Sequence, residues 1–278
     1  MQEYYFLFFV ALVFTIFAVV QDFKRREVAN WINFSFVAIA LAYRAFYSLN
    51  SGNWDFFVFG LLGFAIFFAL ANAFYYSKSF GGGDAKLLMG FGVILPYANY
   101  SDLFFVSILF LILLFGAGAV YSLGYSLFLV YRNIGKFKKE FVANLGKFRL
   151  VYLVDIVLII LSFIMFEVYY AFSIAILLIL FALLYIYLRS LDNCMIVLRK
   201  PTDLTEGDWL VKDFFVKGKW IRKSVHGLSF AQIKVLRKAK KSVLIKEGIE
   251  FTPAFLIALL VLVVLTGYGW AGFLNSYF

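Results

Sequence analysis

Long apolar runs, separated by short polar and basic segments, dominate the hydrophobic pattern of this chain. Many of these runs approach or exceed the ~20 residues that a helix needs to cross a bilayer. They predict eight membrane-spanning helices, near residues 4–20, 31–49, 55–76, 82–98, 102–131, 151–167, 169–188 and 252–274. The first run has neither a basic start nor a small-residue cleavage site, so we expect a retained helix and not a secretory leader.

Two segments between the runs have patterns of their own. In 132–150, apolar residues recur at three- and four-residue spacing with lysines between them, which predicts an amphipathic helix on the membrane surface. In 190–250, the segments Trp209–Val216 and Lys219–Arg222 flank a Lys-Gly pair and predict a β-hairpin. Ser229 and Gln232 have the spacing of a helix capping box. The fold class predicted is an all-α polytopic membrane protein with a small α+β cytoplasmic domain.

Composition and charge add an orientation. The chain has 278 residues, a hydrophobic content of 64% and a net charge of +10. Of its 26 Lys and Arg residues, 25 lie in the segments 21–30, 77–86, 132–150 and 189–250, and Arg44 lies elsewhere. The positive-inside rule places these segments in the cytoplasm and, with eight spans, both termini outside. Topology and anionic lipid explain the charge, so no nucleic-acid partner is expected.

The amino-acid composition gives little support for a metal site or a cofactor site. The chain has one cysteine, Cys194, and one histidine, His226. It therefore lacks the residues for an intrachain disulfide, a cysteine zinc cluster or a histidine-based metal site. We expect no cofactor and no metal.

The loop Phe80–Lys86 places three consecutive glycines and Asp84 between two apolar runs. A carboxylate inside a membrane costs about 2.5–3.5 kcal/mol on insertion scales, so an acid there suggests a functional site. The glycines would allow positive φ angles and close packing of main chain against main chain. The simpler interpretation is a flexible hairpin with Asp84 as a solvated helix N-cap. Gly60, Gly63, Gly116 and Gly118, within the spans, are expected to allow close helix packing.

Asp22 ends the first span and Asp84 opens the fourth, so the predicted topology places both at the cytoplasmic boundary. Two carboxylates at one depth can face each other across a helix bundle and share a proton. One of them can take a proton from water while the other protonates a peptide carbonyl, which hydrolyses the peptide without metal or histidine. Asp155, at similar depth, is the rival partner, and it has no glycines around it.

Two motifs contain these acids, Asp22-x-Lys24-x-Arg26-Glu27-Val28-x-Asn30 and Gly81-x-Gly83-Asp84-x-Lys86-Leu87. They resemble the active-site motifs of the type IV prepilin peptidase family, membrane aspartyl proteases of the GxGD type, and in particular its archaeal preflagellin and prepilin peptidases. The resemblance covers the first four spans and departs at Ala29, where many members have proline. It implies that Asp22 and Asp84 are catalytic. It also implies support from Gly81, Gly83, Lys86, Lys24 and Asn30, and secondary roles for Pro253 and Ala254 in a C-terminal segment that looks like the end of longer archaeal members.

The resemblance implies removal of class III signal peptides from pilin or archaellin precursors, at the cytoplasmic face of the cell membrane. Such substrates carry a basic leader before a long apolar helix. Membrane lipids would be further partners. The acids that could receive the leader are Glu27, Asp203, Glu206 and Asp208. The predicted domains are a catalytic core over 1–131, the interfacial helix 132–150, further spans over 151–189, the cytoplasmic domain 190–250 and a last span over 251–278.

Two other functions remain open from the sequence. A presenilin-like or signal-peptide-peptidase-like protease would cut within the bilayer, and Gly81–Asp84 with Pro253–Phe255 resembles the motifs of that group. Those enzymes carry their aspartates on adjacent helices, whereas two further spans intervene here. A proton-coupled transporter would use the acids as relay groups. Against that, they lie at the boundary and not at the midplane, where transporter sites usually lie.

Overall fold

The computed structural model describes residues 2–216, 218–224 and 227–267, which divide into two compact units. The first unit contains residues up to Leu123 together with those from Ile249 onward, and the second runs from Gly124 to Gly248. His226 and the last residues of the expected span 252–274 lie outside the described residues.

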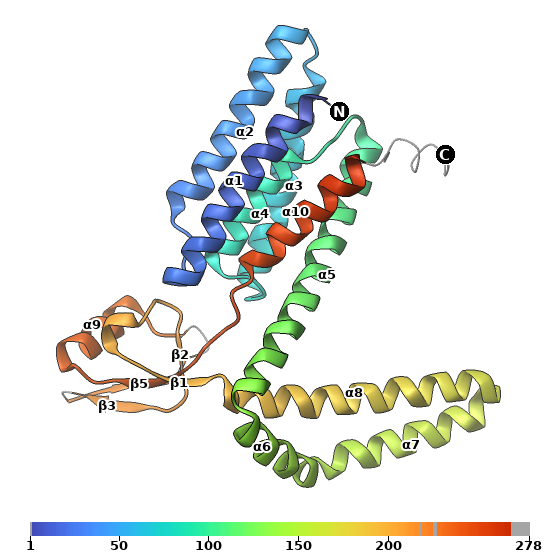
Figure 1. Ribbon diagram of the computed structural model, residues 1–278, viewed down its shortest axis with the longest axis vertical. Coiled ribbons are helices and arrows are strands. Elements are labelled where there is room, and N and C mark those ends of the chain that lie inside the picture. The colour runs from blue at the N-terminus through green and yellow to red at the C-terminus, as the bar shows by residue number, and fades with distance from the viewer. Residues whose placement is uncertain (1, 217, 225–226, 268–278) are drawn as a thin grey trace. The chain divides into compact units, whose positions relative to one another are not determined.

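The first unit is a helical bundle (Figure 1). Its helices are α1 (Gln2–Arg25), α2 (Asn30–Ser51), α3 (Asp55–Tyr76), α4 (Gly82–Ile94), the larger part of α5 (Tyr100–Arg132) and α10 (Thr252–Gly267). The short helix α4 packs against α1, α2 and α3, and α10 packs against α1. The last described helix therefore lies beside the first.

The core of this unit is aromatic and centres on Phe91 of α4. The Phe91 ring stacks on Phe110 of α5 with ring centroids 4.8 Å apart. It also contacts Phe255 of α10 at 5.4 Å and Phe36 of α2 at 5.9 Å. All four side chains are fully buried. Because α4 contributes the central ring, three other helices fix the position of the helix that carries Asp84.

Glycines bring α3 and α4 into backbone contact. A Cβ atom on Gly63 would lie 2.2 Å from the Gly92 carbonyl oxygen, and one on Gly92 would lie 2.5 Å from that of Gly63. Gly60 and Gly118 also have close neighbours, which confirms the expected packing role for three of the four glycines. The expectation was wrong for Gly116, because nothing lies within 4 Å of the place that its Cβ would occupy.

Arg44, the basic residue set apart by its position in the sequence, is fully buried in α2. Its guanidinium donates hydrogen bonds to the carbonyl oxygens of Val93, at 2.7 Å, and Leu95, at 2.7 Å. A third bond, at 2.5 Å, goes to the Phe56 carbonyl. The last carbonyls of a helix have no partner within the helix. Arg44 therefore caps the C-terminal end of α4.

The second unit combines helices with short strands. Its elements are the end of α5, α6 (Ile134–Lys147), α7 (Arg149–Met165), α8 (Val168–Cys194), β1 (Ile196–Arg199), a 3-10 turn η1 (Pro201–Asp203), β2 (Trp209–Leu210), β3 (Phe214–Val216), β4 (Lys219–Ile221), α9 (Phe230–Ala239) and β5 (Val243–Lys246). The strands form a three-stranded antiparallel sheet in the order β1-β5-β2 and a separate β3-β4 hairpin.

The predicted local features of this unit are found in part. Phe214 pairs with Ile221 and Phe215 with Trp220, which confirms the hairpin around Gly218. Trp209–Leu210 was expected in the same hairpin and pairs instead with β5, so that part of the prediction was wrong. The capping box is confirmed, because Ser229 and Gln232 exchange side-chain and backbone hydrogen bonds.

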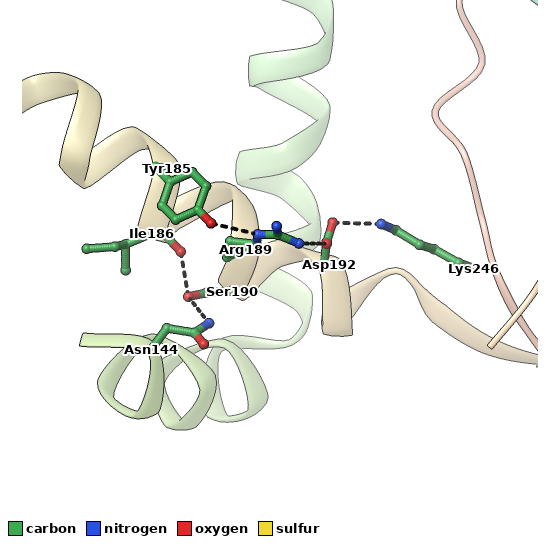
Figure 2. Close-up of polar contacts among 7 residues, drawn as sticks. All are labelled: Asn144, Tyr185, Ile186, Arg189, Ser190, Asp192 and Lys246. Carbon is green, nitrogen blue, oxygen red and sulfur yellow. Dashed lines mark hydrogen bonds and ion pairs between the residues drawn. The ribbon is translucent and has the colours of Figure 1, made fainter. Parts of the chain in front are cut away.

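The amphipathic segment forms α6, whose apolar side contacts α8. The ring of Phe137 lies 5.5 Å from that of Tyr187, and Phe148 lies 5.3 Å from Tyr185. Polar contacts add to this packing, including a hydrogen bond from Asn144 to Ser190 at 3.1 Å (Figure 2). Figure 2 also shows an ion pair from Lys246 to Asp192, at 2.8 Å, which links β5 to the end of α8. The location of α6 on a membrane surface remains a prediction.

Five described helices are long and apolar enough to cross a membrane: α1, α2, α3, α5 and α8. The pair α6–α7, bent by 61°, gives a sixth if it is one broken span. The helix α4, with 13 residues, is shorter than expected, and the described part of α10 has 16 residues. The helical, membrane-spanning class is thus confirmed with a small strand-containing region, and the count of eight spans is not.

Candidate active site

Asp22 and Asp84 lie in the same unit, at neighbouring helix ends. Asp22 occupies the last turn of α1 and is 8% exposed. Asp84 lies in the first turn of α4 and is half-buried. The two carboxyl groups are close enough to interact electrostatically. The structure therefore brings together the two acids that the sequence pairs.

The first turn of α4 holds Asp84 through backbone contacts. Gly81 is the N-cap residue, so the simpler interpretation, with Asp84 as the N-cap, was wrong by three positions. The Asp84 carboxylate accepts a hydrogen bond from the Gly81 backbone. Gly81 has a φ of −68°, and none of the three loop glycines is among the described residues with positive φ. The glycines are therefore not needed here for a left-handed turn.

Gly83 has a packing role instead. A Cβ atom at this position would lie 3.3 Å from two side-chain carbons of Val28 and 3.4 Å from the Val28 backbone nitrogen. Contacts of 3.3 Å are tighter than ordinary van der Waals distances. The glycine thus lets the α1–α2 connection, which belongs to the first motif, lie directly against the helix of the second.

Side-chain hydrogen bonds hold the connection between α1 and α2 in place. Lys86 Nζ donates a hydrogen bond to Asn30 Oδ1 at 2.6 Å, which joins the two motifs. Gln21 Oε1 accepts a hydrogen bond from the Ala29 backbone at 2.6 Å. Lys24, which the resemblance also singles out, is exposed.

Arg26 shapes the turn after α1. Its φ of 56° is left-handed, and its backbone N–H donates to the Asp22 carbonyl at 2.7 Å. Its guanidinium pairs with Glu250 at 3.5 Å, and the Glu250 side chain is 10% exposed. The turn that follows Asp22 is therefore joined to the segment that leads into α10.

Thr252, which the sequence reasoning did not select, contacts Asp22 directly. Its Oγ1 donates a hydrogen bond to Asp22 Oδ2 at 2.8 Å, across 230 positions of the sequence. The Thr252 backbone also hydrogen-bonds this carboxylate. Pro253 and Ala254, the expected secondary residues, are buried next to it in the first turn of α10. The position of Thr252 just before them was the available signal.

The other acids of the sequence lie elsewhere. Asp155 is on α7 in the second unit, whereas Asp22 and Asp84 are in the first. Glu206 and Asp208, also in that unit, accept hydrogen bonds from the backbones of Phe230 and Thr205. Glu27 lies in the first unit and is exposed. Among the described residues, no group of three His, Cys, Asp or Glu side chains could hold a metal ion.

Two buried or half-buried carboxyl groups at the ends of α1 and α4 are the arrangement of a carboxylate dyad, which can exchange protons with water and a peptide. The segment that carries them matches the Type IV leader peptidase family over residues 9–129. The match confirms the family resemblance inferred from the motifs. Thr252 lies outside the matched residues.

The chain is also similar to three preflagellin peptidases from methanogens. It is 27% identical to that of Methanococcus voltae over 149 residues, which are 49% of this chain and 64% of the relative. It is 32% identical to that of Methanocaldococcus jannaschii, over 33% of this chain and 39% of the relative. For Methanococcus maripaludis the identity is 31%, over 29% and 35%. The chain thus spans less than two thirds of each relative. No solved structure matches it.

Proposed function

We propose that this protein is a membrane aspartyl endopeptidase that removes class III signal peptides from pilin- or archaellin-like precursors. The observation that carries the proposal is the placement of Asp22 in the last turn of α1 and of Asp84 in the first turn of α4, where their charges interact. The similarity to leader peptidases and preflagellin peptidases supports the reaction type. The active site would face the cytoplasm, because Lys24, Arg25, Lys78 and Lys86 surround this end of the bundle.

In the proposed reaction the dyad acts as a unit that holds one proton. The ionised member takes a proton from a water molecule, and the resulting hydroxide attacks the scissile carbonyl. The protonated member donates its proton to the carbonyl oxygen. Collapse of the tetrahedral intermediate breaks the C–N bond, and the proton gained from water passes to the leaving amine. A hydroxyl group of the intermediate returns its proton to the second carboxylate as the new carboxyl group forms. The pair then returns to its starting state with one proton between two carboxyl groups.

The surroundings suit a substrate with a basic leader and an apolar helix. The apolar helix would lie in the bilayer beside the bundle, and the leader would reach the end of α1. Glu27 is exposed, lies five positions after Asp22 and is the acid nearest in sequence to the pair. We propose that it binds the basic residues of the leader. The scissile segment must be extended, and the backbone around Gly81 would provide hydrogen-bond partners for it.

The test is cleavage of a candidate precursor by the purified protein, with mass spectrometry of the new N-terminus. Asp22→Asn and Asp84→Asn should each abolish cleavage, because asparagine keeps the shape of the side chain and cannot exchange the proton. The double variant should be no worse than either single one, since the two groups act together. Asp155→Asn is the matched control and should retain activity. An active Asp84→Asn variant would exclude the aspartyl mechanism.

One observation keeps the intramembrane protease as a second candidate. Pro253–Phe255, the segment that resembles a motif of the presenilin-like group, directly follows Thr252, which bonds to Asp22. The position of the cut distinguishes the two functions. A new N-terminus at the start of the apolar helix supports the leader peptidase, and one within that helix supports the intramembrane protease.

A further inference from the structure

The hydrogen bond from Thr252 to Asp22 is the starting point. The Thr252 side chain is fully buried, and its Oγ1 lies 2.8 Å from Asp22 Oδ2. The family match ends at residue 129, so this contact adds a group from the far end of the chain to a site otherwise built from α1 and α4.

Asp22 needs such a donor. Buried carboxylates are stable when their oxygens accept hydrogen bonds, and bonds to a charged acceptor are about twice as strong as neutral ones. The Thr252 hydroxyl and backbone both bond to this carboxylate. A donor fixed on one oxygen also restricts the rotation of the Asp22 carboxyl group, which sets the direction of its second oxygen.

Thr252 is itself held in place. It opens α10, where Phe251 precedes it and Phe255 follows one turn later. The Phe251 ring lies 5.2 Å from that of Phe80, the residue directly before the glycine loop of Asp84. Phe255 packs on Phe91 in the centre of the core. One segment thus contacts Asp22 through Thr252 and the loop of Asp84 through Phe251.

We propose that Thr252 is a positioning residue that orients the Asp22 carboxylate for the dyad. This inference rests on the proposed peptidase function and deepens it. Thr252 does not touch the substrate in this role. Its loss should therefore lower the rate of the chemical step and leave substrate binding nearly unchanged.

The experiment compares Thr252→Val, Thr252→Ser and the wild-type protein in precursor cleavage, with kcat and KM measured separately. Valine keeps the shape and removes the hydroxyl, so kcat should fall about 10- to 100-fold, as for loss of one hydrogen bond to a charged group. KM should change by less than about threefold, within the context dependence of a single contact. Serine keeps the hydroxyl and should restore most of kcat.

Thr266→Val is the matched control. Thr266 is in the same helix, and its hydroxyl bonds to the Val263 carbonyl within that helix, at 3.0 Å. Its replacement should leave kcat unchanged. Thermal unfolding of every variant shows whether the bundle remains folded.

The outcomes separate the two proposals. An active wild-type protein whose Thr252→Val variant keeps its full kcat overturns the positioning role alone. Equal loss in folded Thr252→Val and Thr252→Ser variants also overturns it, because the hydroxyl would then not be the cause. A folded wild-type protein that cleaves no precursor overturns the peptidase function, and with it the positioning role.

Discussion

Lys86 Nζ and Asn30 Oδ1 are 2.6 Å apart, and their hydrogen bond connects α4 to the start of α2. This hydrogen bond is one of the contacts between the motif around Asp22 and the motif around Asp84. The contact fixes the turn after α1 to the helix that carries the second acid.

Replacing this pair should have a small, non-additive effect on stability. Asn30→Ala and Lys86→Ala remove the same bond, so the double variant should cost little more than the larger single loss. The bond is exposed and should contribute about 0.5–1 kcal/mol. Unfolding of the three variants in detergent measures this coupling. If the stability losses of the two single variants add up fully in the double variant, the two side chains do not form this hydrogen bond.

Arg44 should be intolerant of lysine. Lysine keeps the charge and cannot reach three carbonyls in the planar geometry of a guanidinium. Each buried carbonyl left without a donor costs about 1–3 kcal/mol, so Arg44→Lys should lower the free energy of unfolding clearly. Arg222→Lys, at an exposed position of the second unit, is the control and should have no measurable effect. Equal stability of the two variants would argue against the cap on α4.

The glycine contact between α3 and α4 makes a third prediction. Gly63→Ala and Gly92→Ala would place a methyl group within 2.5 Å of a backbone oxygen, and overpacking of this kind costs about 1–3 kcal/mol. Gly116→Ala makes the same substitution in a helix where the methyl group has open space, and it should be neutral or slightly stabilising. Thermal unfolding of the three variants measures these differences in stability. A stable Gly63→Ala variant would mean that the two helices separate at little cost.

Orientation can be tested with single cysteines in a Cys194→Ser background. Ser51 and Lys234 are exposed and lie in segments assigned to opposite sides of the membrane. A membrane-impermeant thiol reagent should label Ser51→Cys in intact cells. It should label Lys234→Cys only after permeabilisation. The reverse pattern would place Asp22 and Asp84 on the outer side.

Hydrophobic runs predicted most helix bounds because lipid imposes one rule on every spanning segment. The run 55–76 and helix α3 (Asp55–Tyr76) agree at both ends. The bounds differ at some helix ends: α1 and α8 continue past the expected residues 20 and 188 to Arg25 and Cys194, and α4, expected to reach residue 98, ends at Ile94. Pro96 directly follows the C-cap residue Leu95 and disfavours a helical conformation there, so the end of α4 has a local signal in the sequence. The hydrogen bonds of Arg44 to the carbonyls of Val93 and Leu95 join distant residues and leave no such signal.

The sequence predicted the residues of the site that lie within the two local motifs. Asp22 and Asp84 stand out as acids beside apolar runs, and the structure brings them together. Thr252 was missed because a threonine at a helix start is ordinary, and only the packing of α10 on α1 gives it a partner. The strand Trp209–Leu210 was misassigned for a related reason, because its partner β5 lies more than 30 positions away while the hairpin turn is local.

Because Asp22 and Thr252 are 230 positions apart, they are also synthesised at different times. At about 5–20 residues per second, the ribosome delivers Thr252 roughly 10–50 s after Asp22. Throughout that interval the nascent N-terminal helices hold both acids without the donor that completes the carboxylate's surroundings. On the proposed function, the nascent enzyme would therefore reach its full rate only after α10 docks on α1.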